Sequence, residues 1–263
     1  MKAWKRIHIT KKRAVCGVLG LLLLAAAYMG VPRAAEKVFA VAEGERRLPI
    51  YCVQTDKPQV SVSFDAAWGA DDTDELLRIL KENDVKATFF LCGYWVEKYP
   101  EEVKKIAAEG HDLGNHSATH PHMSRISSEE IAQELQKCHE NVKKLTGVEM
   151  ELFRPPFGEY DNHVIETAEQ NGYYTIQWDV DSLDWKEQGA EAEIKQVLEH
   201  KHLGNGSIIL FHNDAKYTPK VLDTILKGIK EKGFEIVPIS QLIHRENFEM
   251  DHEGRQILKG KDV

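Results

Sequence analysis

The sequence predicts an α/β fold in which parallel strands close into a barrel with helices on the outside. From Gln59 onward, short apolar runs typical of buried strands alternate with stretches of helical periodicity. No GxGxxG or P-loop motif opens any of these helices, which excludes the common nucleotide-binding forms of such a fold. We therefore expect a barrel of about seven strands with its active site at their carboxyl ends.

The predicted strands are β-branched or continuous apolar runs bounded by polar residues. In chain order they cover residues 48–53, 60–64, 87–91, 112–113, 152–153, 173–178, 207–211 and 234–237.

The predicted helices have apolar residues on one face and recognisable end signals. Ser127 and Glu130 are placed to cap one helix, and Gly147 ends it. In chain order the helices cover residues 73–82, 101–109, 127–145, 162–170, 190–200 and 219–232.

The N-terminus has the layout of a targeting segment. Basic residues precede an uncharged, mainly apolar run of 18 residues at 14–31. We interpret 1–32 as a signal anchor or signal peptide and favour an uncleaved anchor; 33–57 as a juxtamembrane linker; 58–245 as the α/β domain; and 246–263 as a polar tail that frays from Glu249. The domain is then extracytoplasmic, either anchored to the membrane or secreted.

Composition narrows the function classes. The chain has 263 residues and a formal charge of −8, and it lacks the dense basic face that nucleic-acid binding needs. Its four cysteines include no CxxC pair, which argues against a zinc knuckle or a dithiol redox centre. We expect Cys52, Cys92 and Cys138 to be small buried apolar residues.

Ionisable residues gather where the predicted strands end. Asp65, Arg154 and His212 each come directly after a strand, and three acids including Asp184 follow the strand that ends at Trp178. Because the carboxyl ends of parallel strands share one face of a barrel, these groups are expected to form one site.

Two of these motifs carry specific expectations. If residues 116–120 form one helical turn, His116 and His120 point the same way and can hold one divalent metal; the alternative is a pair of exposed or capping histidines. In 154–158, Arg-Pro-Pro-Phe-Gly, a rigid loop presents a guanidinium suited to bidentate capture of a carboxylate; the alternative is an ordinary turn.

Taken together, five motifs resemble the polysaccharide deacetylase family with a NodB homology domain. They occur in the family's order and span about residues 58–245. The sequence Phe-Asp-Ala-Ala-Trp-Gly at 64–69 is similar to that of sporulation-associated members. The motifs are Phe64-Asp65, His116–His120, Arg154–Gly158, Asp184-Trp185 and Leu210–His212. The resemblance implies a distorted (β/α)7 barrel that removes acetyl groups from a cell-wall glycan such as peptidoglycan or a chitin-type polymer.

The resemblance also implies residue roles. His116 and His120 are implied to ligate a divalent metal, typically zinc. Asp65 is the implied general base, held by Arg154, and activates water.

On the other side of the substrate, His212 is the implied general acid, oriented by Asp184. Trp185 and Leu210 are implied to line the acetyl pocket, and the Phe157 N–H to stabilise the oxyanion. An amide needs such help because amine is a poor leaving group until it is protonated.

One position departs from the family's pattern. The first motif usually carries two adjacent acids, of which the second ligates the metal, and here Ala66 takes that place. Asp71 and Asp72 could reach back, although we favour them as the N-cap and first-turn acid of the next helix. Two protein ligands instead of the usual three are expected to weaken metal binding.

Ala66 keeps an alternative function open: a catalytically impaired, glycan-binding protein on a deacetylase scaffold. Hydrolysis of another C–N bond, such as a cyclic amide, is less favoured because the N-terminal segment points to a wall substrate.

Overall fold

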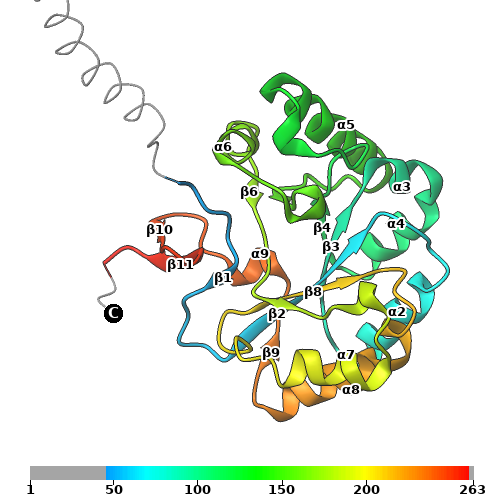
Figure 1. Cartoon of the computed structure of the whole chain (residues 1–263). Coiled ribbons are helices and arrows are strands. Elements are labelled where there is room, and N and C mark those ends of the chain that lie inside the picture. Colours follow the sequence, from blue (N-terminus) through cyan, green and yellow to red (C-terminus); the bar gives the residue numbers. More distant parts are fainter. Residues whose placement is uncertain (1–45, 261–263) are drawn as a thin grey trace, which may run out of the picture. The chain divides into compact units, whose positions relative to one another are not determined.

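A curled parallel sheet forms the centre of the fold (Figure 1). The computed structural model describes residues 46–260. Along the sheet the strands follow the order β6-β5-β4-β3-β2-β8-β7, and β9 also pairs with β2. Their bounds are β2 Gln59–Ala66, β3 Thr88–Leu91, β4 Asp112–Asn115, β5 Leu152–Phe153, β6 Tyr174–Thr175, β7 Val180–Asp181, β8 Ile208–His212 and β9 Glu235–Ile236. The seven-strand path confirms the predicted (β/α)7 barrel.

Helices follow the strands and cover the outside of the sheet (Figure 1). They are α2 Thr73–Glu82, α3 Gly93–Lys98, α4 Pro100–Ala108, α5 Ser128–Thr146, α6 Asn162–Gln170, α7 Ala190–Leu198, α8 Thr218–Glu231 and α9 Ile239–Leu242. The capping box of Ser127 and Glu130 is present, and Gly147 ends α5 with φ 76°. The short helices α3 and α9 were not predicted, because their apolar residues show too little periodicity.

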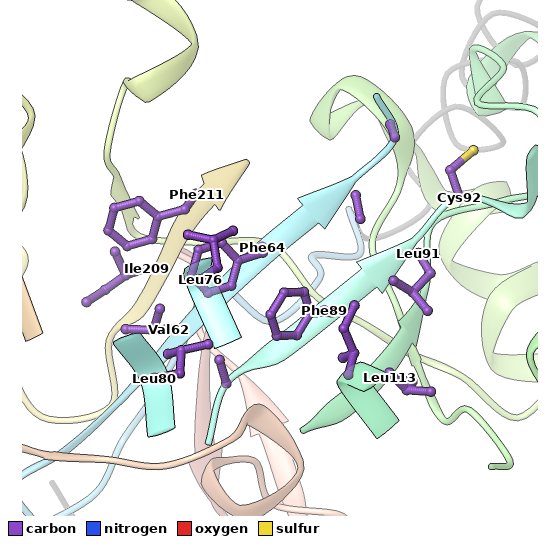
Figure 2. Close-up of a cluster of buried hydrophobic side chains, with 14 of the residues drawn as sticks. Val62, Phe64, Leu76, Leu80, Phe89, Leu91, Cys92, Leu113, Ile209 and Phe211 are labelled. Carbon is purple, nitrogen blue, oxygen red and sulfur yellow. The ribbon is translucent and has the colours of Figure 1, made fainter. Parts of the chain in front are cut away.

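The core under the helices decides which way the site residues face. Phe64 stacks on Phe89 at 4.9 Å and on Phe211 at 5.7 Å between ring centroids, and helix α2 packs onto this layer (Figure 2). Successive side chains of a strand point to opposite faces. The neighbours of Phe64 on β2, Ser63 and Asp65, therefore face the interior of the barrel.

A second, three-stranded sheet ties the described ends of the chain together. It joins β1 Cys52–Val53, β11 Arg255–Leu258 and β10 Phe248–Met250, with β1 and β11 parallel. The prediction that the tail frays from Glu249 is therefore wrong. The buried amide of Gln256 explains the order, since it accepts from His244 N and donates to its carbonyl oxygen.

The described cysteines, Cys52, Cys92 and Cys138, are free and buried, in agreement with the sequence expectation. Between residues 46 and 260 no helix is long and apolar enough to cross a membrane. The predicted targeting segment, 1–32, and most of the predicted linker lie outside the described residues.

Candidate active site

A cavity of about 310 Å³ opens at the carboxyl ends of the central strands. Its lining is Asp65, Ala67, Trp68, His116, His120, Phe157, Gly158, Trp178, Asp181, Trp185, Leu210 and His212. Seven of the nine predicted site residues are in this set, and the other two, Arg154 and Asp184, lie directly behind it. A second cavity of about 280 Å³ is mainly apolar and has Glu169 as its one carboxylate, so it offers no acid–base pair.

Asp65 and Arg154 form a buried ion pair on one side of the cavity. Arg154 Nη1 donates to Asp65 Oδ1 at 2.8 Å, and the guanidinium is fully buried. Burial opposes ionisation of Asp65, but the charge and hydrogen bond of Arg154, with a contribution from His212, outweigh it and hold the pKa of Asp65 below its ordinary value. Asp65 is therefore a carboxylate at neutral pH, as a base must be.

The predicted bidentate capture is wrong. Arg154 gives one nitrogen to Asp65, while Nη2 donates to the carbonyl oxygen of Gln177 at 3.1 Å. The guanidinium carbon also lies 4.1 Å from the centre of the Phe90 ring. The backbone carbonyl and the ring fix the guanidinium plane, so one oxygen of Asp65 stays free of Arg154 and faces the cavity.

His212 and Asp184 form a second pair at the end of β8. His212 Nδ1 lies 2.8 Å from Asp184 Oδ1, and His212 N donates to Oδ2 at 2.6 Å. Burial by itself lowers the pKa of His212, but the hydrogen bond and charge of Asp184 outweigh it and raise that pKa. The geometry agrees with the predicted orientation of His212 by Asp184, and leaves Nε2 facing the cavity.

His116 and His120 meet without the predicted helical turn. Ser117 and His120 both have positive φ, 66° and 58°, and His120 N donates to the Ser117 hydroxyl. This tight loop brings the two imidazole centroids to 4.9 Å. The expectation of one helical turn is wrong, yet the two rings lie together because the loop follows β4 directly.

Both imidazoles are held in the neutral form that binds metals. Burial lowers the pKa of His116, and burial together with His116 lowers the pKa of His120 to about 4. His116 Nδ1 lies 2.7 Å from the carbonyl oxygen of Arg154, which can only accept, so the proton sits on Nδ1. Its Nε2 lone pair is free, at 3.7 Å from Asp65 Oδ2.

The donor set does not complete a catalytic metal site. Across residues 46–260 no group of three or more His, Cys, Asp or Glu side chains could hold a metal ion. Ala66 is fully buried, and neither Asp71 nor Asp72 lines the cavity. Asp72 occupies the N-cap position of α2 but makes no side-chain capping hydrogen bond, and the first-turn acids are Asp74 and Glu75, so the capping prediction holds only for the position of one residue. Two imidazoles and the Arg154-bound Asp65 fall short of the three ligands usual for catalytic zinc.

The remaining predicted residues lie on the cavity wall. Phe157 has φ 60° and its side chain is 54% exposed, while Trp185 is 58% exposed and Leu210 is buried. Their predicted roles in binding the acetyl group and the oxyanion stay predictions, because no bound substrate tests them. Asp179, in contrast, accepts from Ser207 and Ile208 N and is a structural residue.

Sequence reasoning missed Trp68 as a site residue. It lines the cavity with 54% of its surface exposed, and its ring meets the His120 ring edge-on at 5.1 Å. The Phe157 ring also contacts the His120 ring, at 4.4 Å between centroids, so two aromatic rings pack against this imidazole. The signal was its position three residues after Asp65, on the loop that leaves the same strand end.

Comparison with known proteins agrees with this architecture. The family model described as polysaccharide deacetylase matches residues 53–176. The chain is 34% identical over 194 residues to a peptidoglycan-N-acetylglucosamine deacetylase of Bacillus cereus, covering 71% of this chain and 69% of that protein. It is also 36% identical to the uncharacterised protein YlxY of Bacillus subtilis, over 74% of this chain but only 60% of that relative's length.

One of the similar solved structures is described as a pseudoenzyme. BA3943 of Bacillus anthracis, described as a CE4 family pseudoenzyme, superposes with a TM-score of 0.71 at 36% identity, over 74% of this chain and 68% of that one. A mutant of BA3943 described as having restored enzymatic activity superposes equally well. The fold is therefore compatible with both states.

Proposed function

The chain belongs to the polysaccharide deacetylase family, and from that premise we propose that it hydrolyses acetyl groups from a cell-wall glycan. The observation that carries the proposal is that two hydrogen-bonded side-chain pairs border one cavity. Asp65 is held by Arg154 on one side, and His212 by Asp184 on another. An acid and a base whose neighbours hold their pKa values apart are what hydrolysis of an amide needs.

The described residues supply the proton transfers. Asp65 takes a proton from the water whose oxygen attacks the acetyl carbonyl carbon. His212 Nε2 gives a proton to the sugar nitrogen as its bond to carbon breaks, so that acetate and a free amine leave. Arg154 and Asp184 fix the two transferring groups and keep them in separate roles.

Membership of the family supports a divalent metal as cofactor, and we propose zinc. A bound metal polarises the carbonyl and lowers the pKa of water. In this chain His116 and His120 are the available protein ligands, and the third place falls at Ala66. No step above is therefore assigned to the metal, and we expect weak metal binding.

Exposed aromatic side chains support a sugar substrate. Trp68, Phe157 and Trp185 are the large hydrophobic side chains that stand exposed in the described part of the chain, and all three line the cavity. Apolar faces at a rim of carboxylates and imidazoles suit the face of a pyranose ring. We further propose an extracytoplasmic location next to the wall, with the N-terminal segment at the membrane, on the strength of its basic and apolar layout.

Acetate release tests the proposal. The purified chain is incubated with acetylated peptidoglycan and chitin oligomers, with chelator, with zinc and with cobalt. Acetate that appears with added metal and disappears in Asp65→Asn supports the proposal. Folded protein that releases none under any metal would contradict it.

A second candidate, glycan binding without turnover, is favoured by Ala66 and by the likeness to a pseudoenzyme. The same preparation distinguishes the two. Retention on insoluble glycan that survives both Asp65→Asn and His212→Ala, together with no acetate from the parent chain, would support binding alone.

A further inference from the structure

A third carboxylate lies behind the Asp184–His212 pair. Asp184 is 3% exposed and accepts from the backbone nitrogens of Trp185 and His212 and from the His212 ring. Its fourth donor is the hydroxyl of Thr218, which lies 3.3 Å from Oδ2. A carboxylate has about four acceptor sites, so Thr218 completes the set.

The same hydroxyl has a second acceptor. Thr218 Oγ1 lies 2.8 Å from Oε1 of Glu193, which projects from α7. Glu193 is 4% exposed, and within residues 46–260 its other oxygen, Oε2, has no hydrogen-bond partner. A charged carboxylate so buried and so poorly bonded is costly, and protonation removes that cost.

A threonine hydroxyl carries one proton, so it can donate to one of the two carboxylates at a time. While Glu193 is ionised, Thr218 donates to Glu193 over the shorter distance, and Asp184 lacks its fourth donor. Once Glu193 is protonated, its own O–H donates to Thr218 Oγ1, and the Thr218 proton turns to Asp184.

We propose that Glu193 is a positioning residue for the Asp184–His212 pair, and that its protonation decides which carboxylate receives the Thr218 hydroxyl proton. The inference rests on the proposed function for its catalytic meaning. Its physical content is a coupling between Glu193 and His212 through Thr218, which exists whether or not the chain turns over substrate.

The electrostatics of Glu193 place the switch near neutral pH. Burial raises the pKa of Glu193 to about 7, against the Thr218 hydrogen bond that lowers it, and the charge of Asp184 adds to the rise. Asp184 is the charged group that acts on Glu193. The amide of Gln196 and the phenol of Tyr217 line the same small cavity.

The sign for His212 follows. An ionised Glu193 adds negative charge nearby and takes a donor away from Asp184, which makes Asp184 a stronger partner for the imidazolium. Both effects favour protonated His212. As pH rises through 7, the switch therefore helps the general acid keep its proton.

Nitrogen NMR of the histidine rings tests the coupling in the full chain. In the parent, the His212 ring signals are expected to show their own titration and a second inflection near pH 7. Glu193→Gln, whose amide can always donate to Thr218, is expected to remove that inflection and lower the His212 pKa by about 0.5–1 unit. The matched control is Glu191→Gln, which removes an exposed charge from the same helix.

Thr218 gives a test that does not depend on changing Glu193. Thr218→Ser retains the hydroxyl and is expected to keep the inflection. Thr218→Val lacks the hydroxyl and is expected to reduce the inflection to the part that the charge of Glu193 exerts directly. If Glu193→Gln behaves like Glu191→Gln, or if Thr218→Val retains the full inflection of the parent, the proposal is overturned. Absence of acetate release with the coupling intact would defeat the proposed function and leave this inference standing.

Discussion

Two sides of one cavity differ in how complete their sets of functional residues are. On the acid–base side, Asp65 and His212 each keep a buried partner at 2.8 Å. On the proposed metal side, His116 and His120 are held neutral and lie close together, and Ala66 stands where the resemblance implies a third ligand. The residues of the two sides come from different positions at the strand ends, so one set can change while the other stays intact.

The register of the sheet relates the position of Ala66 to that of His116. Ala66 ends β2 and pairs in register with Leu91, whose carbonyl oxygen accepts from His116 N. A side chain at position 66 therefore projects from β2, which is separated by β3 from the strand that leads to His116. Alanine at this position contributes a methyl group and no donor atom. The Asp65–Arg154 and Asp184–His212 pairs beside it are intact.

The largest expected effect breaks the acid–base side. Asp65→Asn removes the base and should lower turnover by about 10²–10⁴-fold. It also leaves the buried Arg154 without its counter-charge, at a cost on the order of 3–5 kcal/mol of stability. Acetate release and urea unfolding measure the two effects.

The exposed Asp84 provides the control for that change. Its φ is 49°, a conformation asparagine adopts readily, so Asp84→Asn should alter neither quantity. An Asp65→Asn variant as active as Asp84→Asn would mean that Asp65 is not the base.

Repair of the metal side is the next largest effect. Ala66→Asp should raise zinc affinity by about 10–100-fold, since the carboxylate adds the missing ligand. Without metal, the same buried charge should destabilise the fold. Calorimetry measures the zinc affinity, and thermal melts in chelator and in zinc measure the stability without and with metal. Ala66→Asn is the uncharged control. Equal zinc affinity in the two variants would show that position 66 cannot reach the histidines.

The pH dependence sharpens the acid half of the comparison. Because the pKa of His212 is raised, activity should persist above pH 6.5 and fall as pH rises through that raised value. Asp184→Asn should move this alkaline limb down by about 1–2 units. Asp181→Asn, a weaker contributor to the same pKa, should move it less, and a profile that leaves the limb in place in Asp184→Asn would remove His212 as the acid.

The smallest expected effect concerns the cavity rim, which both sides share. Trp68→Ala should raise KM by about tenfold and leave kcat nearly unchanged, because an exposed ring binds substrate and transition state alike. Trp68→Phe should retain most of the affinity. Steady-state kinetics measures this, and a drop in kcat instead would assign Trp68 to holding His120.

The local pattern of apolar and polar residues in the sequence predicted much of the fold. Helices α2 and α6 and strand β5 have the bounds that their periodicity indicated. Strand β11 escaped prediction because it is held by pairing with the distant strand β1, and β10 pairs in turn with β11. Helix α3 escaped prediction because its six residues show too little periodicity. The apparent tail became ordered for the same reason, through contacts between β11 and β1.

The sequence by itself determined the parallel α/β barrel, the residues that would gather at one face and the missing acid at position 66. These are encoded by chain order, since each polar residue directly follows an apolar strand. Tertiary structure decided the rest: the single hydrogen bond from Arg154 to Asp65, the left-handed loop that joins His116 to His120, the place of Trp68 and the shared hydroxyl of Thr218. The hydrogen bonds of Arg154 and Thr218 join elements far apart in the chain, which no local pattern contains. The loop depends on positive φ at two residues other than glycine, which apolar periodicity does not indicate.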